Sequence, residues 1–206
     1  MREHPLLMKG PLVRATLEGR KTQTRRPVKM PSHGVEPYNP GYADGAFWNY
    51  SFTDIIARSP LGRAGDRLWV RETWAWPGEE EFIYRADQWA EDMVAKWKTD
   101  PNYPQVKWSP SIHMPRRACR LVLPLVSVRV ERVQDITEED AKAEGVEPVL
   151  MRGIGSYPEW MRPTMREVGG HQKAFELLWK QIYGDALWDA NPWVWVAEWE
   201  DIEVSR

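Results

Sequence analysis

The stretch "CRLVLPLVSVRVERVQDITEEDAKAEGV", residues 119–146, sets the order of the fold. Its first half is predicted to be one long strand, or two strands separated at Pro124, because proline cannot donate a hydrogen bond within a sheet. Its second half is predicted to be a helix with Thr137 as the N-cap and Gly145 as the stop. Three acidic residues occupy the first turn, where the helix dipole favours negative charge.

A shorter pair of elements is predicted near the N-terminus. Residues 10–18 are expected to form a helix, since Pro11 suits a first turn and Gly19 suits a helix end. The segment 21–28 is expected to be extended as far as Pro27, because the residue before a proline avoids the helical region. The chain therefore passes from a short helix into a polar, extended segment.

The remaining elements predict the fold class. They are a strand at 65–72, a strand at 81–87, a helix at 88–98, a helix at 172–183 and a strand at 192–204. The helix at 172–183 is amphipathic, and its expected buried stripe is Phe175, Leu178, Trp179 and Ile182. Pro- and Trp-rich insertions are expected at about 29–64 and 86–107. Without regular βαβ alternation, we expect one α+β domain over 1–206, a mixed β-barrel with flanking short helices.

Composition limits the possible environment and partners. The chain has 206 residues, 42% of them hydrophobic, and its formal net charge is −2. We expect a globular cytoplasmic protein that is not bound to a membrane, because no apolar run approaches the roughly 20 residues that span a bilayer. The single cysteine, Cys119, cannot form an internal disulfide and gives little support for a zinc site. Any nucleic-acid contact must come from a local basic patch. No metal, cofactor or obligatory protein partner is indicated.

The stretch "EGRKTQTRR", residues 18–26, is such a patch. Lys21 and Thr24 lie in it among three arginines, Arg20, Arg25 and Arg26. A lysine whose pKa is lowered by burial or by neighbouring cations can act as a base, and a threonine hydroxyl can then be the nucleophile. The alternative is that the basic residues only solvate a loop and the threonines support extended backbone.

The familiar catalytic motifs are missing from the sequence. Nucleobase deaminases need a zinc-binding His-x-Glu and Pro-Cys-x-x-Cys, but the four histidines are scattered and Cys119 is alone. The sequence also lacks a Gly-x-Ser-x-Gly, a phosphate-binding loop and a dinucleotide fingerprint. His113, in "SPSIHMPRR", is the one histidine set among residues that suggest a site.

The chain contains 13 tryptophans. Most are expected to fill a β-rich core, because tryptophan suits a half-buried strand. Trp48, Trp74 and Trp76 lie beside polar or Pro/Gly turns, so they are candidates for stacking on a base.

Four segments together resemble the ASCH domain family, in the larger form often found in phages and prophages. They are "EGRKTQTRR", "GDRLWVRETW", residues 109–146 and the closing "LWKQIYG...NPWVWVAEWE". The Gly-x-Lys-x-x-Thr-x-Arg block is the most specific of these. The resemblance implies a β-barrel similar to the PUA domain. It also implies a lysine, threonine and glutamate set like that of the bacterial N4-acetylcytidine amidohydrolases, which falls on Lys21, Thr24 and Glu144. Other members are RNA-binding or ribonuclease-like.

The sequence therefore supports two hypotheses. In the first, a metal-independent amidohydrolase removes an acyl group from the exocyclic amine of a nucleobase in a nucleoside or RNA substrate. Lys21, Thr24 and Glu144 would be catalytic, and the substrate-binding candidates are Arg20, Arg25, Arg26, Arg71, Glu72, Trp74 and His113. In the second, the chain is a non-catalytic module that binds RNA or a modified nucleotide, or a ribonuclease.

Overall fold

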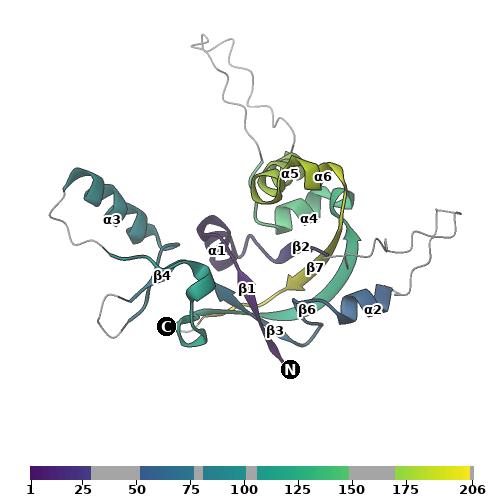
Figure 1. The fold of residues 1–206 in the computed structure, drawn as a ribbon, viewed down its shortest axis with the longest axis horizontal. Helices are drawn as coiled ribbons and strands as arrows, with labels where there is room; N and C mark the ends of the chain where they lie inside the picture. Colours follow the sequence, from purple (N-terminus) through teal and green to yellow (C-terminus); the bar gives the residue numbers. More distant parts are fainter. Residues whose placement is uncertain (29–51, 77–80, 101–105, 149–169, 205–206) are drawn as a thin grey trace, which may run out of the picture.

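The structure is a computed structural model that describes residues 1–28, 52–76, 81–100, 106–148 and 170–204. These residues form a mixed α+β fold in which helices surround a curved sheet (Figure 1). Trp48 and the segments 29–51 and 101–105 of the two expected insertions lie outside the described residues. The described part of the first insertion begins with a helix, and that of the second contains one.

The main sheet has six strands. Its order is β1–β3–β6–β7–β2, with β8 paired to β6, and a separate two-stranded sheet pairs β4 with β5. Only β1 and β3 run parallel among these pairs. The bounds are β1 Glu3–Leu7, β2 Gln23–Pro27, β3 Arg67–Arg71, β4 Trp74–Ala75, β5 Ile83–Tyr84, β6 Leu121–Arg132, β7 Trp193–Trp199 and β8 Glu203–Val204.

β6 is one continuous strand, although Pro124 lies inside it. Its first part pairs with β3 as far as Pro124, and its second part pairs with β7 from Leu125 onward. Proline is tolerated at this point because the strand changes partner there, and the register with β7 shifts between Leu125 and Ser127. This long strand joins the two halves of the sheet.

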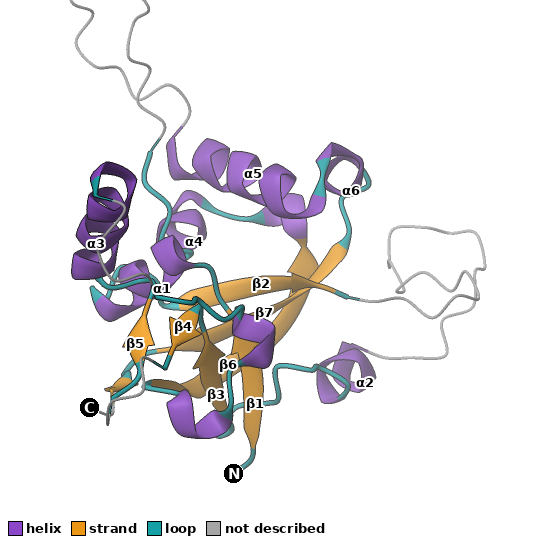
Figure 2. Cartoon of the chain, turned by 60° about the vertical axis from the view of Figure 1, so that its left-hand side comes forward, coloured by secondary structure: helices purple, strands orange, loops and turns teal. Residues whose placement is uncertain are grey.

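The described strands do not close into the expected barrel. β1 and β2 are the two edges of the sheet, and among the described residues no backbone pairing joins them. β2 runs across the direction of β1 (Figure 2) and ends at Pro27, which has no N–H to donate. A side chain makes the contact between the edges: Nη2 of Arg26 donates to the carbonyl of Leu7 at 3.0 Å.

The four helices that the sequence predicts are present. They are α1 Gly10–Leu17, α3 Gln88–Thr99, α4 Glu138–Ala143 and α5 Gly170–Tyr183. The structure adds the helices α2 Phe52–Ala57 and α6 Asp185–Asp189 and the short 3₁₀ turns η1 Ser111–His113, η2 Arg116–Ala118 and η3 Val133–Asp135. α1 ends at Gly19, whose φ is +73°, and Thr137 caps α4 by accepting from the Asp140 N–H at 3.1 Å. Neither α6 nor β1 was expected.

The two faces of β7 pack into different cores. Trp195, Ala197 and Trp199 face a core with β1, β3 and α1, while Val194 and Val196 face a core with α4 and α5. Phe175 and Trp179 of α5 belong to the second core, as predicted. The prediction was wrong for Ile182, which is 38% exposed because it lies at the end of the helix beyond the sheet.

The α4 and α5 helices are connected through one carboxylate. Glu138, in the first turn of α4, accepts hydrogen bonds from the backbone N–H groups of His171 at 2.6 Å and Gln172 at 3.0 Å. These are the first free N–H groups of α5, so Glu138 caps that helix from outside. The hydrogen bonds from His171 and Gln172 lower the pKa of the Glu138 carboxyl below its ordinary value of 4.5.

Glu138→Gln is expected to lower the free energy of unfolding at pH 7 by about 0.3–1 kcal/mol, the range for a charge at a helix end. A lowered carboxyl pKa stabilises the fold above the ordinary value, and this contribution is lost as the pH falls through the folded-state value. Urea unfolding from pH 7 to pH 3 should therefore show the variant and the wild type converging in acid. Glu139→Gln, exposed in the same turn, is the control. An equal loss in both variants would contradict the capping role.

Candidate active site

Lys21 lies in the connection between α1 and β2, and its side chain is only 1% exposed. The backbone N–H groups of Arg20 and Lys21 both donate to the Ala15 carbonyl, at 2.8 and 2.9 Å, which turns the chain back under the helix. Nζ of Lys21 donates to the Gln23 carbonyl at 2.6 Å, the Glu144 carbonyl at 3.0 Å and Oε2 of Glu144 at 2.7 Å. Three acceptors use the three hydrogens of the ammonium form.

The electrostatic setting of Lys21 favours loss of its proton. Burial lowers the pKa of Lys21 below its ordinary value of 10.5, and the charges of Arg26 and Arg25 lower it further. The Glu144 carboxylate opposes this effect through its charge and its hydrogen bond. Because burial has the larger effect on the lysine pKa, the amine is closer to a usable base than an exposed lysine.

Glu144 is the residue that ends α4, and it is 4% exposed. A negative charge at a helix C-terminus is ordinarily unfavourable by about 0.3–1 kcal/mol. Here two cations compensate it: Oε2 accepts from Lys21, and Oε1 accepts from Nη1 of Arg25 at 3.2 Å. The structure thus brings Lys21 and Glu144 into direct contact.

Thr24 lies in β2 and is fully buried. Its Oγ1 accepts a hydrogen bond from Nη1 of Arg26 at 2.6 Å, which leaves the hydroxyl hydrogen free to be given to a base. Among the described residues no hydrogen bond joins Thr24 to Lys21, whose Nζ instead contacts the carbonyl of the residue before Thr24. A cation therefore polarises the hydroxyl, while the lysine lies beside the adjoining backbone.

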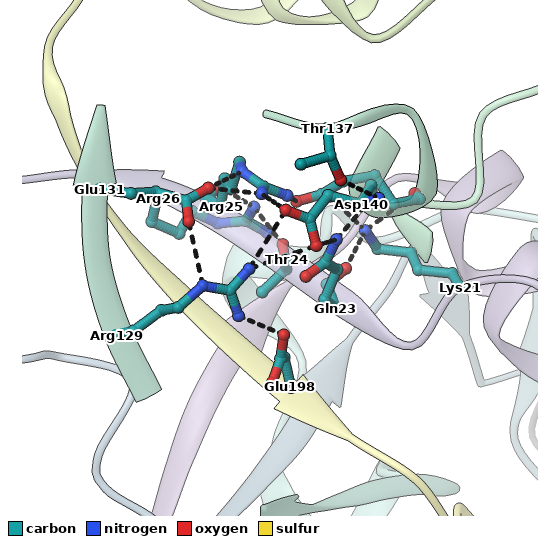
Figure 3. Close-up of polar contacts among 11 residues, drawn as sticks. Lys21, Gln23, Thr24, Arg25, Arg26, Arg129, Glu131, Thr137, Asp140 and Glu198 are labelled. Carbon is teal, nitrogen blue, oxygen red and sulfur yellow. Dashed lines mark hydrogen bonds and ion pairs between the residues drawn. The ribbon is translucent and has the colours of Figure 1, made fainter. Parts of the chain in front are cut away.

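Arg25 is the centre of a buried ion-pair network (Figure 3). Its guanidinium donates to Glu131 on β6, to Oδ2 of Asp140 on α4 at 2.9 Å and to Glu144. It also lies 5.8 Å over the ring of Phe175 on α5. One side chain of β2 thereby holds β6, which lies beyond β7 in the sheet, and two helices, so Arg25 is a structural residue in this arrangement.

Gln23 and Arg129 extend the network. The Gln23 amide donates to the Asp140 carbonyl at 2.6 Å and to its carboxylate at 3.0 Å. Arg129 donates to Glu131 at 3.0 Å and to Asp140 at 3.2 Å, and it also pairs with Glu198. Five residues of this network were not predicted: Gln23, Arg129, Glu131, Asp140 and Glu198. A usable signal was the spacing of two residues between Gln23 and Arg25 in β2 and between Arg129 and Glu131 in β6. Side chains two residues apart lie on the same face of a strand.

The other predicted substrate-binding residues are not all near Lys21. Arg20 is exposed and pairs with Glu18. Glu72 is buried and pairs with Arg120, with Nε to Oε1 at 2.9 Å, and burial raises the pKa of this carboxyl. This ion pair occupies Glu72 in a structural contact.

The remaining three predicted residues lie on other elements of the fold. Arg71 ends β3, Trp74 begins β4, and His113 is exposed in η1. Arg71 is nonetheless linked to Arg26, since Leu7 is the register partner of Arg71 and its carbonyl binds Arg26.

A cavity of about 410 Å³ lies beside the β-bridge that pairs the backbones of Lys21 and Glu144. Its lining includes Arg20, Thr22, Lys142 and His171, and excludes Lys21, Thr24 and Glu144. Since Thr24 is fully buried, a substrate can reach its hydroxyl only if a covering group moves. Arg26 contacts that hydroxyl directly.

Gly145→Ala is expected to lower the free energy of unfolding by about 2–4 kcal/mol. Gly145 has φ of +79°, and an added Cβ would lie 2.7 Å from Cβ of Lys21 and 2.9 Å from Cβ of Ala15. Gly19→Ala is the matched control, because Gly19 has φ of +73° with nothing within 4 Å. The control should lose about 1–2 kcal/mol. Equal losses in urea unfolding would show that the contact with Lys21 is not tight.

No protein-family model matches the chain, and comparison with curated proteins and with solved structures gives no match either. Within the described ranges, no group of three or more His, Cys, Asp or Glu side chains is arranged to hold a metal ion. None of the helices described is both long and apolar enough to cross a bilayer.

Proposed function

We propose that the protein hydrolyses an amide formed on the exocyclic amine of a nucleobase, as in N4-acetylcytidine. The observation that carries this proposal is the buried contact between Nζ of Lys21 and Oε2 of Glu144 at 2.7 Å. The pKa of Lys21 is lowered by burial, and Lys21 precedes Thr24 by three residues. The hydroxyl of Thr24 already accepts a hydrogen bond from the guanidinium of Arg26. The resemblance to the ASCH family, with its PUA-like barrel, supports the same assignment.

The reaction would proceed through an acyl-threonine. Lys21, in its neutral form, gives up one of its backbone contacts and takes the proton of Thr24 as Oγ1 attacks the acyl carbon. Arg26, already 2.6 Å from Oγ1, is placed to stabilise the negative charge that develops on the former carbonyl oxygen. The carbon–nitrogen bond then breaks, and the ammonium of Lys21 returns the proton to the departing amine. Water finally attacks the acyl-threonine, which releases the acid and restores the hydroxyl.

Glu144 has a positioning role in this scheme. Its carboxylate holds Nζ of Lys21 and balances the ammonium that forms during the reaction. Its second oxygen is held by Arg25, so the carboxylate cannot rotate away from the lysine. The network around Arg25 thereby fixes the base relative to β2.

The direct test is incubation of the purified chain with N4-acetylcytidine. The expected result is release of cytidine and acetate in equal amounts, measured by chromatography. Failure to release cytidine under conditions in which a small ASCH amidohydrolase is active would overturn the proposal.

Glu144→Gln is expected to lower kcat on N4-acetylcytidine about a hundredfold or more, the range for lost acid–base assistance. KM should change much less, since Glu144 touches Lys21 and not the substrate. Glu147→Gln is the control, because the Glu147 side chain is 78% exposed and meets Arg20 only at 3.8 Å. Unfolding curves for both variants separate a loss of turnover from a loss of fold. Undiminished kcat in Glu144→Gln would remove Glu144 from the mechanism.

A further inference from the structure

Arginine side chains stack on tryptophan rings in and beside β3, β4, β5, η1 and η2. Three pairs stack closely: Arg71 lies 5.2 Å over Trp69, Arg117 lies 5.5 Å over Trp76, and Arg85 lies 5.9 Å over Trp108. We name these six residues the Arg–Trp surface. None of the six belongs to the network around Arg25.

Backbone and core contacts hold the Arg–Trp surface together. Trp74 forms an antiparallel bridge to Ser109, next to Trp108, and pairs with Tyr84 across β4 and β5. The Tyr84 hydroxyl donates to the Ala118 carbonyl of η2 at 3.0 Å, which ties the turn that carries Arg117 to this sheet. The surface therefore sits on a single packed base.

The arginines of the Arg–Trp surface have no ion-pair partner among the residues that the structure describes. Within the described part of the chain, no carboxylate pairs with Arg71, Arg85 or Arg117. Three nearby acids pair with other arginines: Glu3 pairs with Arg116, and both Glu72 and Asp87 pair with Arg120. With a formal net charge of −2 for the whole chain, this is a local cationic patch.

One aromatic ring of the patch is open to solvent. Trp76 is 48% exposed, and its ring is held edge-on by Phe82 at 4.6 Å, which in turn contacts Trp74 at 5.5 Å. The patch therefore offers an exposed ring beside positive charges.

This combination matches one ligand chemistry. A single-stranded nucleic acid presents base faces that stack on aromatic rings, and phosphates that pair with arginines. A duplex presents phosphates but keeps its bases stacked inside. An acidic protein partner would supply charge without a regular series of π faces.

We propose that the Arg–Trp surface binds a single-stranded nucleic acid, with bases stacked on Trp76 and phosphates held by Arg71, Arg85 and Arg117. Its position suits delivery of a base to Thr24, because Leu7 pairs with Arg71 in the sheet and its carbonyl binds Arg26, the partner of Thr24. That second step rests on the proposed function. The binding itself does not.

The test is fluorescence anisotropy of the whole chain with labelled, unmodified 12-nucleotide single strands of RNA and of DNA, and with a duplex of the same length. We expect saturable binding of a single strand, weaker binding of the duplex, and a loss of affinity as salt rises. Comparison of the RNA and DNA arms shows which of the two strands is preferred.

Two exposed residues give the variants. Trp76→Ala is expected to weaken single-strand binding about tenfold, and Arg117→Ala is expected to reduce the slope of log affinity against log salt by about 0.7. Leu177→Ala, an exposed apolar residue of α5, and Arg63→Ala, an exposed arginine before β3, are the matched controls. Controls that lose as much as the two variants would overturn the proposal.

Equal affinity for the duplex and the single strands would also overturn the inference. Because the oligonucleotide is unmodified, no hydrolysis is needed for a signal. A chain that binds the strand but releases no cytidine from N4-acetylcytidine refutes the proposed function alone. A chain that releases cytidine but does not bind the strand refutes this inference alone.

Discussion

Thr24→Ala is expected to lower kcat on N4-acetylcytidine by a factor of about 10⁴ or more, because the variant has no hydroxyl to form the acyl intermediate. Thr24→Ser keeps the hydroxyl and should retain measurable turnover. In single-turnover experiments, a covalent acyl adduct should form with the wild type and the serine variant and be missing from the alanine variant. Intact mass measurement detects that adduct directly.

The fold should survive this substitution. Arg26 loses one acceptor when Thr24 becomes alanine, but its guanidinium still donates to the carbonyls of Arg25 and Leu7, at 2.8 and 3.0 Å. The expected change in the free energy of unfolding is about 1 kcal/mol. Turnover that persists in Thr24→Ala would show that the nucleophile is another group. Lys21 would then not act as the base that accepts the proton of the Thr24 hydroxyl.

Arg25→Met is expected to lower the free energy of unfolding by about 3–5 kcal/mol, the largest stability loss that we predict. Methionine fills much of the same space but leaves Glu131, Asp140 and Glu144 without the guanidinium that they share. The cost arises because the three carboxylates then share only Lys21 and Arg129, which leaves an excess of negative charge around the buried Glu144. This is more unfavourable than the loss of an exposed ion pair.

Arg20→Met is the matched control for this experiment. Arg20 is also in the basic stretch, but it pairs with Glu18 at the surface and should contribute about 0–1 kcal/mol. Urea unfolding of both variants gives the comparison. Similar losses for Arg20 and Arg25 would mean that the network around Arg25 adds nothing beyond ordinary surface charge.

Elements with local signals in the sequence were predicted well. α1, β2 and α4 have boundaries set by Pro11, Gly19, Pro27, Thr137 and Gly145, and each of these residues acts on its immediate neighbours. The strand β6 was ambiguous from sequence, because the effect of Pro124 depends on which strand lies beside it. Only the change of partner at that point explains why the strand continues.

Elements that depend on distant partners were missed. β1 contains a proline and pairs in parallel with β3, more than sixty residues later, so nothing local marks it as a strand. The closing segment 192–204 was predicted as one strand, but it divides into β7 and β8, which pair with different parts of β6. The open sheet was also missed, because the relative direction of β1 and β2 is a property of the whole fold.

The contact between Lys21 and Glu144 followed from the resemblance to the ASCH family and not from the residues themselves. Arg25 was predicted to bind substrate with the other arginines, whereas the structure gives it three carboxylate partners, of which Glu144 is buried. Which acid meets which arginine depends on the pairing of β2 with β7 and on the position of α4 above them. Neither can be obtained from the stretch "EGRKTQTRR" alone.

The place of β7 between β6 and β2 has a consequence for synthesis of the chain. Thr24 pairs with Ala197, near the other end of the sequence, so β2 leaves the ribosome long before its only neighbour in the described sheet exists. An apolar strand waiting this long would present an unpaired edge to other nascent chains. The segment that becomes β2 is Gln-Thr-Arg-Arg-Pro, whose polar side chains remain hydrated until β7 has been synthesised. The charges that later become buried are thus the same groups that keep the unfinished protein from aggregating.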